Sequence, residues 1–151
     1  MWPTGQPYRA PPPGGSLAKI LVADDHDDAR RVFCSVLRDA HHEVIEAADG
    51  LQAIALFEQH RPDVALIDIF MPGRDGVEVI RSIRAADPRI RVLAVSAGWH
   101  LKLPTRGGAS QGDLMQDARA AGADGTISKP IDHRFLLAEV GRLLRERPLD
   151  G

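Results

Sequence analysis

Residues 64–76 have the sequence VALIDIFMPGRDG, which indicates a buried strand, a turn and the start of a helix. Val64 to Ile67 form a short apolar run without polar alternation, as in strands that are covered on both faces. Asp68 follows this run, and the Met71-Pro72-Gly73 segment after it cannot continue a strand. We therefore predict that Asp68 lies at the carboxyl end of a buried strand, where ligands bind in open α/β sheets. Asp75 is a candidate N-cap of the helix that follows.

The rest of the chain repeats this alternation of short apolar strands and amphipathic helices. Further strands are predicted at 19–23, 43–47, 91–96 and 125–128. Helices are predicted from apolar residues at the 3.6-residue period, with Arg30, Arg31 and Arg38 assigned to the solvent side of the first one. These apolar residues are Ala29, Val32, Phe33, Val36 and Leu37; Ala53, Ile54 and Phe57; Val77, Ile80 and Ile83; and Phe135, Leu136, Val140 and Leu143. A short further helix is predicted near 114–121. Five β-α repeats predict a parallel sheet with helices on both faces.

Length and composition are those of one soluble domain. The chain has 151 residues, of which 44% are hydrophobic and 26% charged, so it can form one core but not two. A net charge of -2 and the lack of a basic run argue against nucleic-acid binding. No segment resembles a membrane span or a signal peptide, and the single cysteine, Cys34, cannot form an internal disulfide, so we expect a cytoplasmic protein in which Cys34 is a packing residue.

Proline and glycine mark the expected boundaries of the domain. Residues 1–16 are rich in both and poor in aliphatic residues, which predicts a disordered tail. The folded domain is expected to span 17–147, with a long irregular loop at 97–113 that is either functional or disordered. Trp99 and Leu101 are the loop residues expected to pack or to contact a partner. No output domain is expected after the final helix.

Polar residues follow four of the five predicted strands: Asp24 and Asp25, Asp68, Ser96, and Lys129. In a parallel sheet of strand order 2-1-3-4-5, the first and third strands are neighbours, so three carboxylates would meet. Such a cluster requires a proton or a cation, and an all-oxygen site with positions for water suits Mg²⁺. Simpler roles are open for each residue: Asp25, Asp27 and Asp28 could cap the first helix and complement its dipole, Asp68 could be a turn residue, and Ser96 and Lys129 could be solvated. His41 and His42 are predicted to be surface residues.

The combination of motifs resembles the receiver domain of two-component response regulators over about residues 18–146. The resemblance rests on Asp24-Asp25, on Asp68 with Met71-Pro72 and Asp75-Gly76, on Ser96-Ala97, and on Ala121-Gly122-Ala123 before Lys129-Pro130. It implies a flavodoxin-like, doubly wound (βα)5 sandwich with the strand order 2-1-3-4-5.

This resemblance also implies a signalling function. Asp68 would accept a phosphoryl group from a phosphohistidine of a histidine kinase or phosphotransfer protein, in a Mg²⁺-dependent reaction with Lys129 near the phosphoryl oxygens. Asp24, Asp25, Asp68 and the backbone carbonyl of Phe70 would hold Mg²⁺. Ser96 would be the switch hydroxyl. The domain would then bind a downstream protein or pass the phosphoryl group along a phosphorelay, as a monomer or a phosphorylation-dependent homodimer.

Two features depart from the family pattern. Thr126 stands where the family usually has an aromatic switch residue, and the segment after Ser96 is longer than usual. Trp99 is a possible substitute for the aromatic residue.

Other functions remain open. One is a binding module of the same fold that acts without phosphorylation, which Thr126 and the long loop favour. Another is a phosphatase with an aspartyl nucleophile, although Phe70 occupies the place where a second acid is usual. A cofactor-binding flavodoxin-like protein lacks support, because no glycine-rich loop follows the first strand.

Overall fold

The computed structural model describes residues 17–71, 75–96 and 111–145, in which five strands alternate with five helices. The strands are β1 (Lys19–Ala23), β2 (Glu43–Ala47), β3 (Val64–Asp68), β4 (Arg91–Ser96) and β5 (Gly125–Ser128). The helices are α1 (Asp27–Asp39), α2 (Gly50–His60), α3 (Gly76–Ala86), α4 (Gln111–Ala121) and α5 (His133–Arg145).

The strands form one parallel sheet in the order β2-β1-β3-β4-β5, which confirms the predicted fold class and topology. The register places Asp68 beside Val95 and Ser96 beside Ser128. The carboxyl ends of β1, β3, β4 and β5 therefore lie along one edge of the sheet, which we call the carboxyl edge. The opposite edge is called the amino edge.

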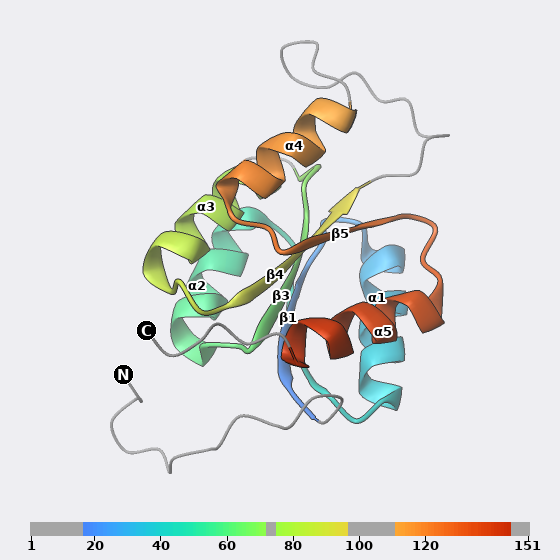
Figure 1. Ribbon diagram of the computed structural model, residues 1–151. Helices are drawn as coiled ribbons and strands as arrows, with labels where there is room; N and C mark the ends of the chain where they lie inside the picture. Colours follow the sequence, from blue (N-terminus) through green and yellow to red (C-terminus); the bar gives the residue numbers. More distant parts are fainter. Residues whose placement is uncertain (1–16, 72–74, 97–110, 146–151) are drawn as a thin grey trace.

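Two hydrophobic clusters cover the two faces of the sheet, because successive side chains of a strand point to opposite faces. Ile20 and Val22 of β1 belong to the cluster beneath α1 and α5, whereas Leu21 and Ala23 belong to the cluster beneath α2, α3 and α4. Figure 1 shows this three-layer arrangement, with α1 and α5 on one side of the sheet and the other three helices on the opposite side.

Some sequence predictions need correction. Helix α4 begins at Gln111, three residues before the predicted start, because the glycine-rich segment before it carries no periodic signal. Val32 and Phe135, predicted to face inward, are 43% and 47% exposed, so the buried stripes of α1 and α5 are narrower than expected. His42 is not a plain surface residue, because its Nδ1 accepts a hydrogen bond from the Ala18 N–H at 3.0 Å.

Cys34 is buried, as predicted for a packing residue. The expectations for residues 1–16, for Trp99 and Leu101, and for the 97–110 part of the predicted loop lie outside the described residues.

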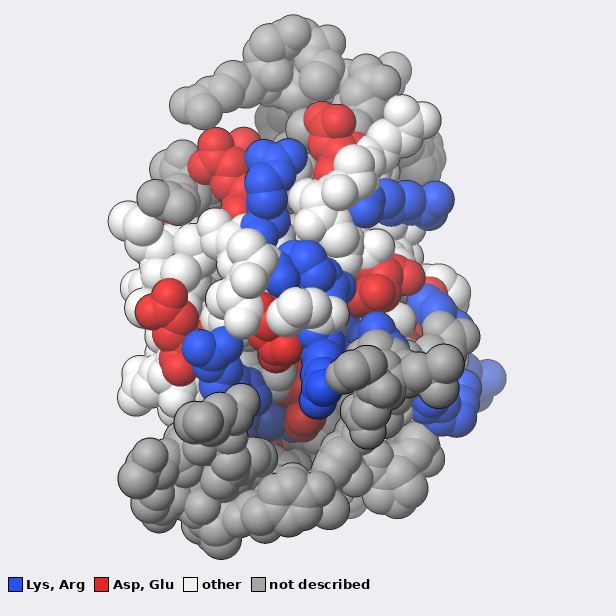
Figure 2. All heavy atoms as spheres, turned by 60° about the vertical axis from the view of Figure 1, so that its left-hand side comes forward, with Lys and Arg blue, Asp and Glu red and all other residues white. Residues whose placement is uncertain are grey.

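Charge is mixed on the surface that can be inspected. Figure 2 turns the left-hand side of Figure 1 forward and shows basic and acidic side chains interspersed on that face. Within 17–71, 75–96 and 111–145, none of the helices is both long and apolar enough to cross a membrane.

Candidate functional site

Three carboxylates converge at the carboxyl edge. Asp24 follows β1 directly, Asp25 comes next in the chain, and Asp68 is the last residue of β3. Their carboxylate oxygens lie within 4.8 Å of one another. Asp24 and Asp68 are buried, with exposed fractions of 1% and 4%, whereas Asp25 is open to solvent. The structure thus brings together the three acids that the sequence assigned to one crevice.

Lys129 supplies a positive charge between the two buried acids. It follows β5, and its Nζ lies 3.0 Å from Asp68 Oδ2 and 2.8 Å from Asp24 Oδ2. The contact with Asp68 is a directed hydrogen bond. The contact with Asp24 is a close ion pair to Oδ2, a buried oxygen. One ammonium group is therefore shared by two carboxylates.

Burial dominates the electrostatics of Asp68. It raises the pKa of the Asp68 carboxyl to about 7 in the absence of a cation, with Lys129 opposing and Asp24 reinforcing the shift. Burial alone would lower the pKa of Lys129, but the attraction of Asp68 and Asp24 raises it above its ordinary value. Lys129 therefore stays charged, and the carboxylate cluster retains an excess of negative charge.

Local backbone geometry fixes both buried acids. The Phe70 N–H donates to Asp68 Oδ1 at 2.8 Å, and the His26 N–H donates to Asp24 Oδ1 at 2.9 Å. Gly76 begins α3 so close to β3 that an added Cβ would overlap the carbonyl oxygen of Asp68. Glycine is required at this close approach of a helix start to a strand end.

The cluster fits a hard divalent cation. It offers carboxylate oxygens from three residues, among them the buried Asp24 Oδ2, and one shared lysine balances only part of their charge. Oxygen ligands with space for water are the preference of Mg²⁺, and a cation would relieve the repulsion between the acids. Phe70 lies two residues after Asp68, next to this cluster, and its carbonyl remains a predicted ligand.

Ser96 is buried at the end of β4, and its Oγ lies 3.3 Å from Oγ of Ser128. The two serines are register partners on β4 and β5, and the Lys129 N–H donates to the Ser96 carbonyl oxygen at 3.0 Å. The hydroxyl of Ser96 is therefore paired with another hydroxyl beside the cluster. The sequence analysis did not single out Ser128, although its place directly before Lys129 was a signal.

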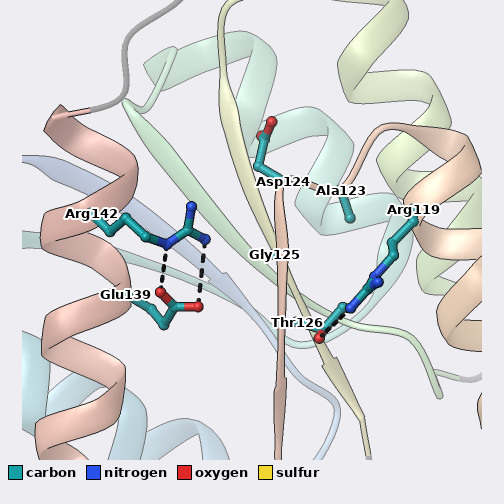
Figure 3. Close-up of a pocket in the computed structure, with 7 residues that line it drawn as sticks. All are labelled: Arg119, Ala123, Asp124, Gly125, Thr126, Glu139 and Arg142. Carbon is teal, nitrogen blue, oxygen red and sulfur yellow. Dashed lines mark hydrogen bonds and ion pairs between the residues drawn. The ribbon is translucent and has the colours of Figure 1, made fainter.

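Thr126 lies away from the carboxylates, in an open groove of about 430 Å³ between α4 and α5. Figure 3 shows Arg119 of α4 extending toward Thr126, with a separating distance of 3.5 Å between Arg119 Nη2 and Thr126 Oγ1. On the other side of β5, Glu139 accepts hydrogen bonds from Arg142 of the same helix. A polar contact thus occupies the position where the family pattern has an aromatic side chain.

Two expectations about the first helix are corrected. Asp25, Asp27 and Asp28 were considered as caps, but the N-cap is His26 and its side chain makes no capping hydrogen bond. Asp27 and Asp28 lie in the first turn, where their charge complements the helix dipole as the simpler interpretation expected. Arg30 was assigned to the solvent side, but its side chain is only 14% exposed and bonds the backbone of Asp24. A long side chain can reach back from a polar helix face, which periodicity does not register.

Comparison with known proteins adds independent information. The family model of the response regulator receiver domain matches residues 20–141. Sporulation initiation phosphotransferase F of Bacillus subtilis (strain 168) is 32% identical over 114 residues, which are 76% of this chain and 83% of that protein. The chemotaxis protein CheY of Halobacterium salinarum (strain ATCC 29341 / DSM 671 / R1) is 30% identical over 126 residues, covering 83% of this chain and 96% of that protein.

Among solved structures, a CheY-like response regulator receiver domain protein from Methanospirillum hungatei JF-1 is similar, with a TM-score of 0.74 and 28% sequence identity. The match covers 87% of this chain and 96% of that one.

Proposed function

Because the chain belongs to the response regulator receiver domain family, we propose that it is a phosphoacceptor whose reactive group is Asp68. Receiver domains are signalling domains, and this one would receive a phosphoryl group from a phosphohistidine of a histidine kinase or phosphotransfer protein. The observation that carries the proposal is the placement of Asp68, a buried carboxylate that shares one lysine with Asp24 at the carboxyl edge.

The transfer needs only Asp68 as the nucleophile and the phosphohistidine of the partner as the donor. An Asp68 carboxylate oxygen attacks phosphorus as the bond from phosphorus to the histidine nitrogen breaks, and the electron pair stays on the imidazole. Lys129, next to Asp68, neutralises charge on the phosphoryl oxygens. Bound Mg²⁺ would supply further positive charge there and favour the ionised form of Asp68. Asp24, Asp25, Asp68 and the Phe70 carbonyl would hold it.

The hydroxyl of Ser96 would be the element that responds to phosphorylation. Ser96 Oγ now lies 3.3 Å from Ser128 Oγ, and in our proposal it would turn its hydrogen toward an oxygen of the new phosphoryl group. Movement at the end of β4 would then alter the surface of α4, β5 and α5, where Thr126 lies, and a downstream protein or a second copy of the chain would bind the altered surface.

Intact-mass spectrometry after incubation with acetyl phosphate tests the proposal. The native protein should gain one phosphoryl group only when Mg²⁺ is present, and Asp68→Asn should gain none. Asp63→Asn is a matched control, because Asp63 comes directly before the first residue of β3, at the opposite end of the strand from Asp68. This variant should gain the phosphoryl group as the native protein does. Lack of any adduct on native protein that also fails to bind beryllofluoride would contradict the proposal.

A second function is favoured by one observation. The Arg119 to Thr126 contact replaces the usual aromatic side chain with a polar pair on the α4 and α5 surface. A receiver-fold module that binds a partner independently of phosphorylation would use such a surface in a single conformation, without a switch between two conformations. Failure of the phosphorylation test, with partner binding retained in Asp68→Asn, would favour this alternative.

A further inference from the structure

Arg30 of α1 connects the metal-ligand loop to the body of the domain. Its Nη1 donates to the carbonyl oxygen of Asp24 at 2.7 Å, its Nη2 donates to Asp27 at 2.6 Å, and its Nε donates to Glu46 at 3.2 Å. The three contacts use all three nitrogens of the guanidinium, and the side chain is 14% exposed. Such a fork holds one orientation, since each nitrogen is directed by a different acceptor.

The contact with the Asp24 carbonyl bears on the candidate cation site. That carbonyl belongs to the peptide plane joining Asp24 to Asp25, so its orientation fixes one backbone angle of each residue and thereby constrains where both side chains begin. Among the described residues, Arg30 is the hydrogen-bond donor to this carbonyl. The two carboxylates would have to remain within a few tenths of an ångström of a fixed arrangement to bind Mg²⁺, which demands near-ideal octahedral geometry.

Glu46 anchors the other side of the fork. It lies on β2, the strand next to β1, and it also accepts a hydrogen bond from Arg38 at 3.1 Å. Arg38 therefore shares Glu46 with Arg30, and it bonds Glu46 rather than the Asp24 backbone. Arg38 carries the same charge about two turns further along α1, which makes it a matched control for charge without contact to the Asp24 backbone.

We propose that Arg30 is a positioning residue for the cation site, acting through the Asp24–Asp25 peptide plane. This inference rests on the proposed function, because it concerns the cation that phosphoryl transfer to Asp68 would use. Arg30 does not touch the cation or the reacting atoms. It sets the directions of the Asp24 and Asp25 carboxylates.

Charge and geometry have opposite effects on cation binding at this position, and two variants separate them. Arg30→Lys keeps the positive charge but loses the fork, whereas Arg30→Gln also removes a charge that repels the cation. If Arg30 acted only as a charge, Arg30→Gln would bind Mg²⁺ more tightly and Arg30→Lys would bind it as the native protein does. If Arg30 positions the loop, both variants bind Mg²⁺ more weakly.

The experiment titrates the full chain with Mg²⁺ and monitors the backbone amide signals by NMR. It is performed on the native protein and on the variants Arg30→Lys, Arg30→Gln and Arg38→Gln. We expect the Mg²⁺ dissociation constant to rise about fivefold in Arg30→Lys and somewhat less in Arg30→Gln. Arg38→Gln should stay near the native value. Circular dichroism confirms that each variant is folded at the temperature of the titration.

A kinetic split adds a readout that a general loss of stability would not produce. With acetyl phosphate as donor, the Mg²⁺ concentration for half-maximal phosphorylation should rise in Arg30→Lys, while the rate at saturating Mg²⁺ stays near that of the native protein. This pattern is expected because Arg30 does not contact the phosphoryl group.

Other results overturn the inference. Native-like Mg²⁺ affinity in Arg30→Lys, or equal weakening in Arg38→Gln, would show that the fork on Asp24 has no positioning effect. If the native protein itself binds no Mg²⁺ and gains no phosphoryl group, the proposed function fails as well. That result is distinguished from failure of the Arg30 inference alone by the native titration.

Discussion

Aspartate side chains have opposite environments at the two edges of the sheet. At the carboxyl edge, the buried acids Asp24 and Asp68 share the ammonium group of Lys129, and Asp25 adds a third carboxylate. At the amino edge, Asp124 accepts from the Val92 N–H and from Arg84, both at 2.8 Å. Aspartate is therefore part of a hydrogen-bonded network with its own donors at the amino edge, which we call closed. At the carboxyl edge it is part of a cluster with excess negative charge, which we call open.

A second acid completes the amino edge in the same manner. Asp63 Oδ2 accepts from the Lys19 N–H at 2.8 Å, which ties the start of β3 to the start of β1. An acid with its own donors stabilises the fold, whereas acids that cluster around one shared lysine keep an excess of negative charge and are candidates for cation binding. The difference between the edges thus separates acids that serve the fold from the acids that we propose to be reactive.

The largest expected effect is the loss of Arg84, the main cation of the amino edge. Its guanidinium donates to the carbonyl oxygens of Pro88, Ile90 and Gly122 and to Asp124. Arg84→Ala should lower the free energy of unfolding in urea by about 3 kcal/mol, since several partly buried acceptors lose their donor. Arg81→Ala, an exposed residue of the same helix, is the control. A change below about 0.5 kcal/mol in Arg84→Ala would show that this network is not structural.

Removing one carboxylate charge at each edge should change stability in opposite directions. Without Mg²⁺ at pH 8, Asp68→Asn should raise the free energy of unfolding by about 2 kcal/mol, because ionised Asp68 is buried and its pKa lies above the unfolded value. Asp124→Asn should lower it by about 1 kcal/mol, because Arg84 loses an ionised acceptor. Urea unfolding of both variants measures the two signs.

The pH dependence of Asp68 follows from the same shift. Its pKa is raised in the native state, so this group favours folding when protonated. Its contribution to stability decreases as pH rises from about 4 to about 7 and is constant above that. The difference in stability between Asp68→Asn and native protein should therefore grow over this range. A difference that does not vary with pH would mean that Asp68 is not perturbed.

Mg²⁺ should act only on the open edge. At a concentration tenfold above its dissociation constant, Mg²⁺ should raise the free energy of unfolding of the native protein by about 1.4 kcal/mol. The gain should largely disappear in Asp68→Asn and persist in Asp124→Asn. Thermal unfolding with Mg²⁺, with Ca²⁺ and with matched ionic strength of NaCl separates site binding from screening. Equal gains in both variants would contradict a site at the carboxyl edge.

The smallest effect concerns His42, which lies at the amino edge and bonds the backbone directly before β1. Burial lowers its pKa, and its Nδ1 accepts from the Ala18 N–H, so the ring is neutral in the native state. Its contribution to stability should therefore be present above its unfolded pKa and be lost as pH falls through its native pKa. An NMR titration should place the native pKa of His42 below the ordinary value for histidine. A pKa at or above that value would contradict the closed arrangement.

The apolar pattern of the sequence was sufficient to predict the strands, whereas their order came from the resemblance to receiver domains. The five predicted strand ranges coincide with β1 to β5, because each apolar run ends at a polar residue or a turn signal. The strand order implied by the resemblance, which the structure confirms, then places Asp24, Asp68 and Lys129 together. The predicted roles of these residues in phosphoryl transfer remain predictions.

Other features depend on side-chain direction, which periodicity does not contain. Arg30 lies on the polar face of α1 but turns back to Asp24, and His42 turns inward to a backbone N–H. Ser128 pairs with Ser96 only through the strand register. The start of α4 at Gln111 was missed because glycine and polar residues precede it.

The most direct test of the account is to locate the phosphoryl group after incubation with acetyl phosphate and Mg²⁺. Borohydride reduces an aspartyl phosphate to a stable alcohol, and peptide mass spectrometry then identifies the residue. The account predicts modification at Asp68, with Asp63 and Asp124 unmodified. Modification at an amino-edge acid, or at Asp24 or Asp25 with Asp68 intact, would contradict the claim that the open edge presents Asp68 as the reactive group.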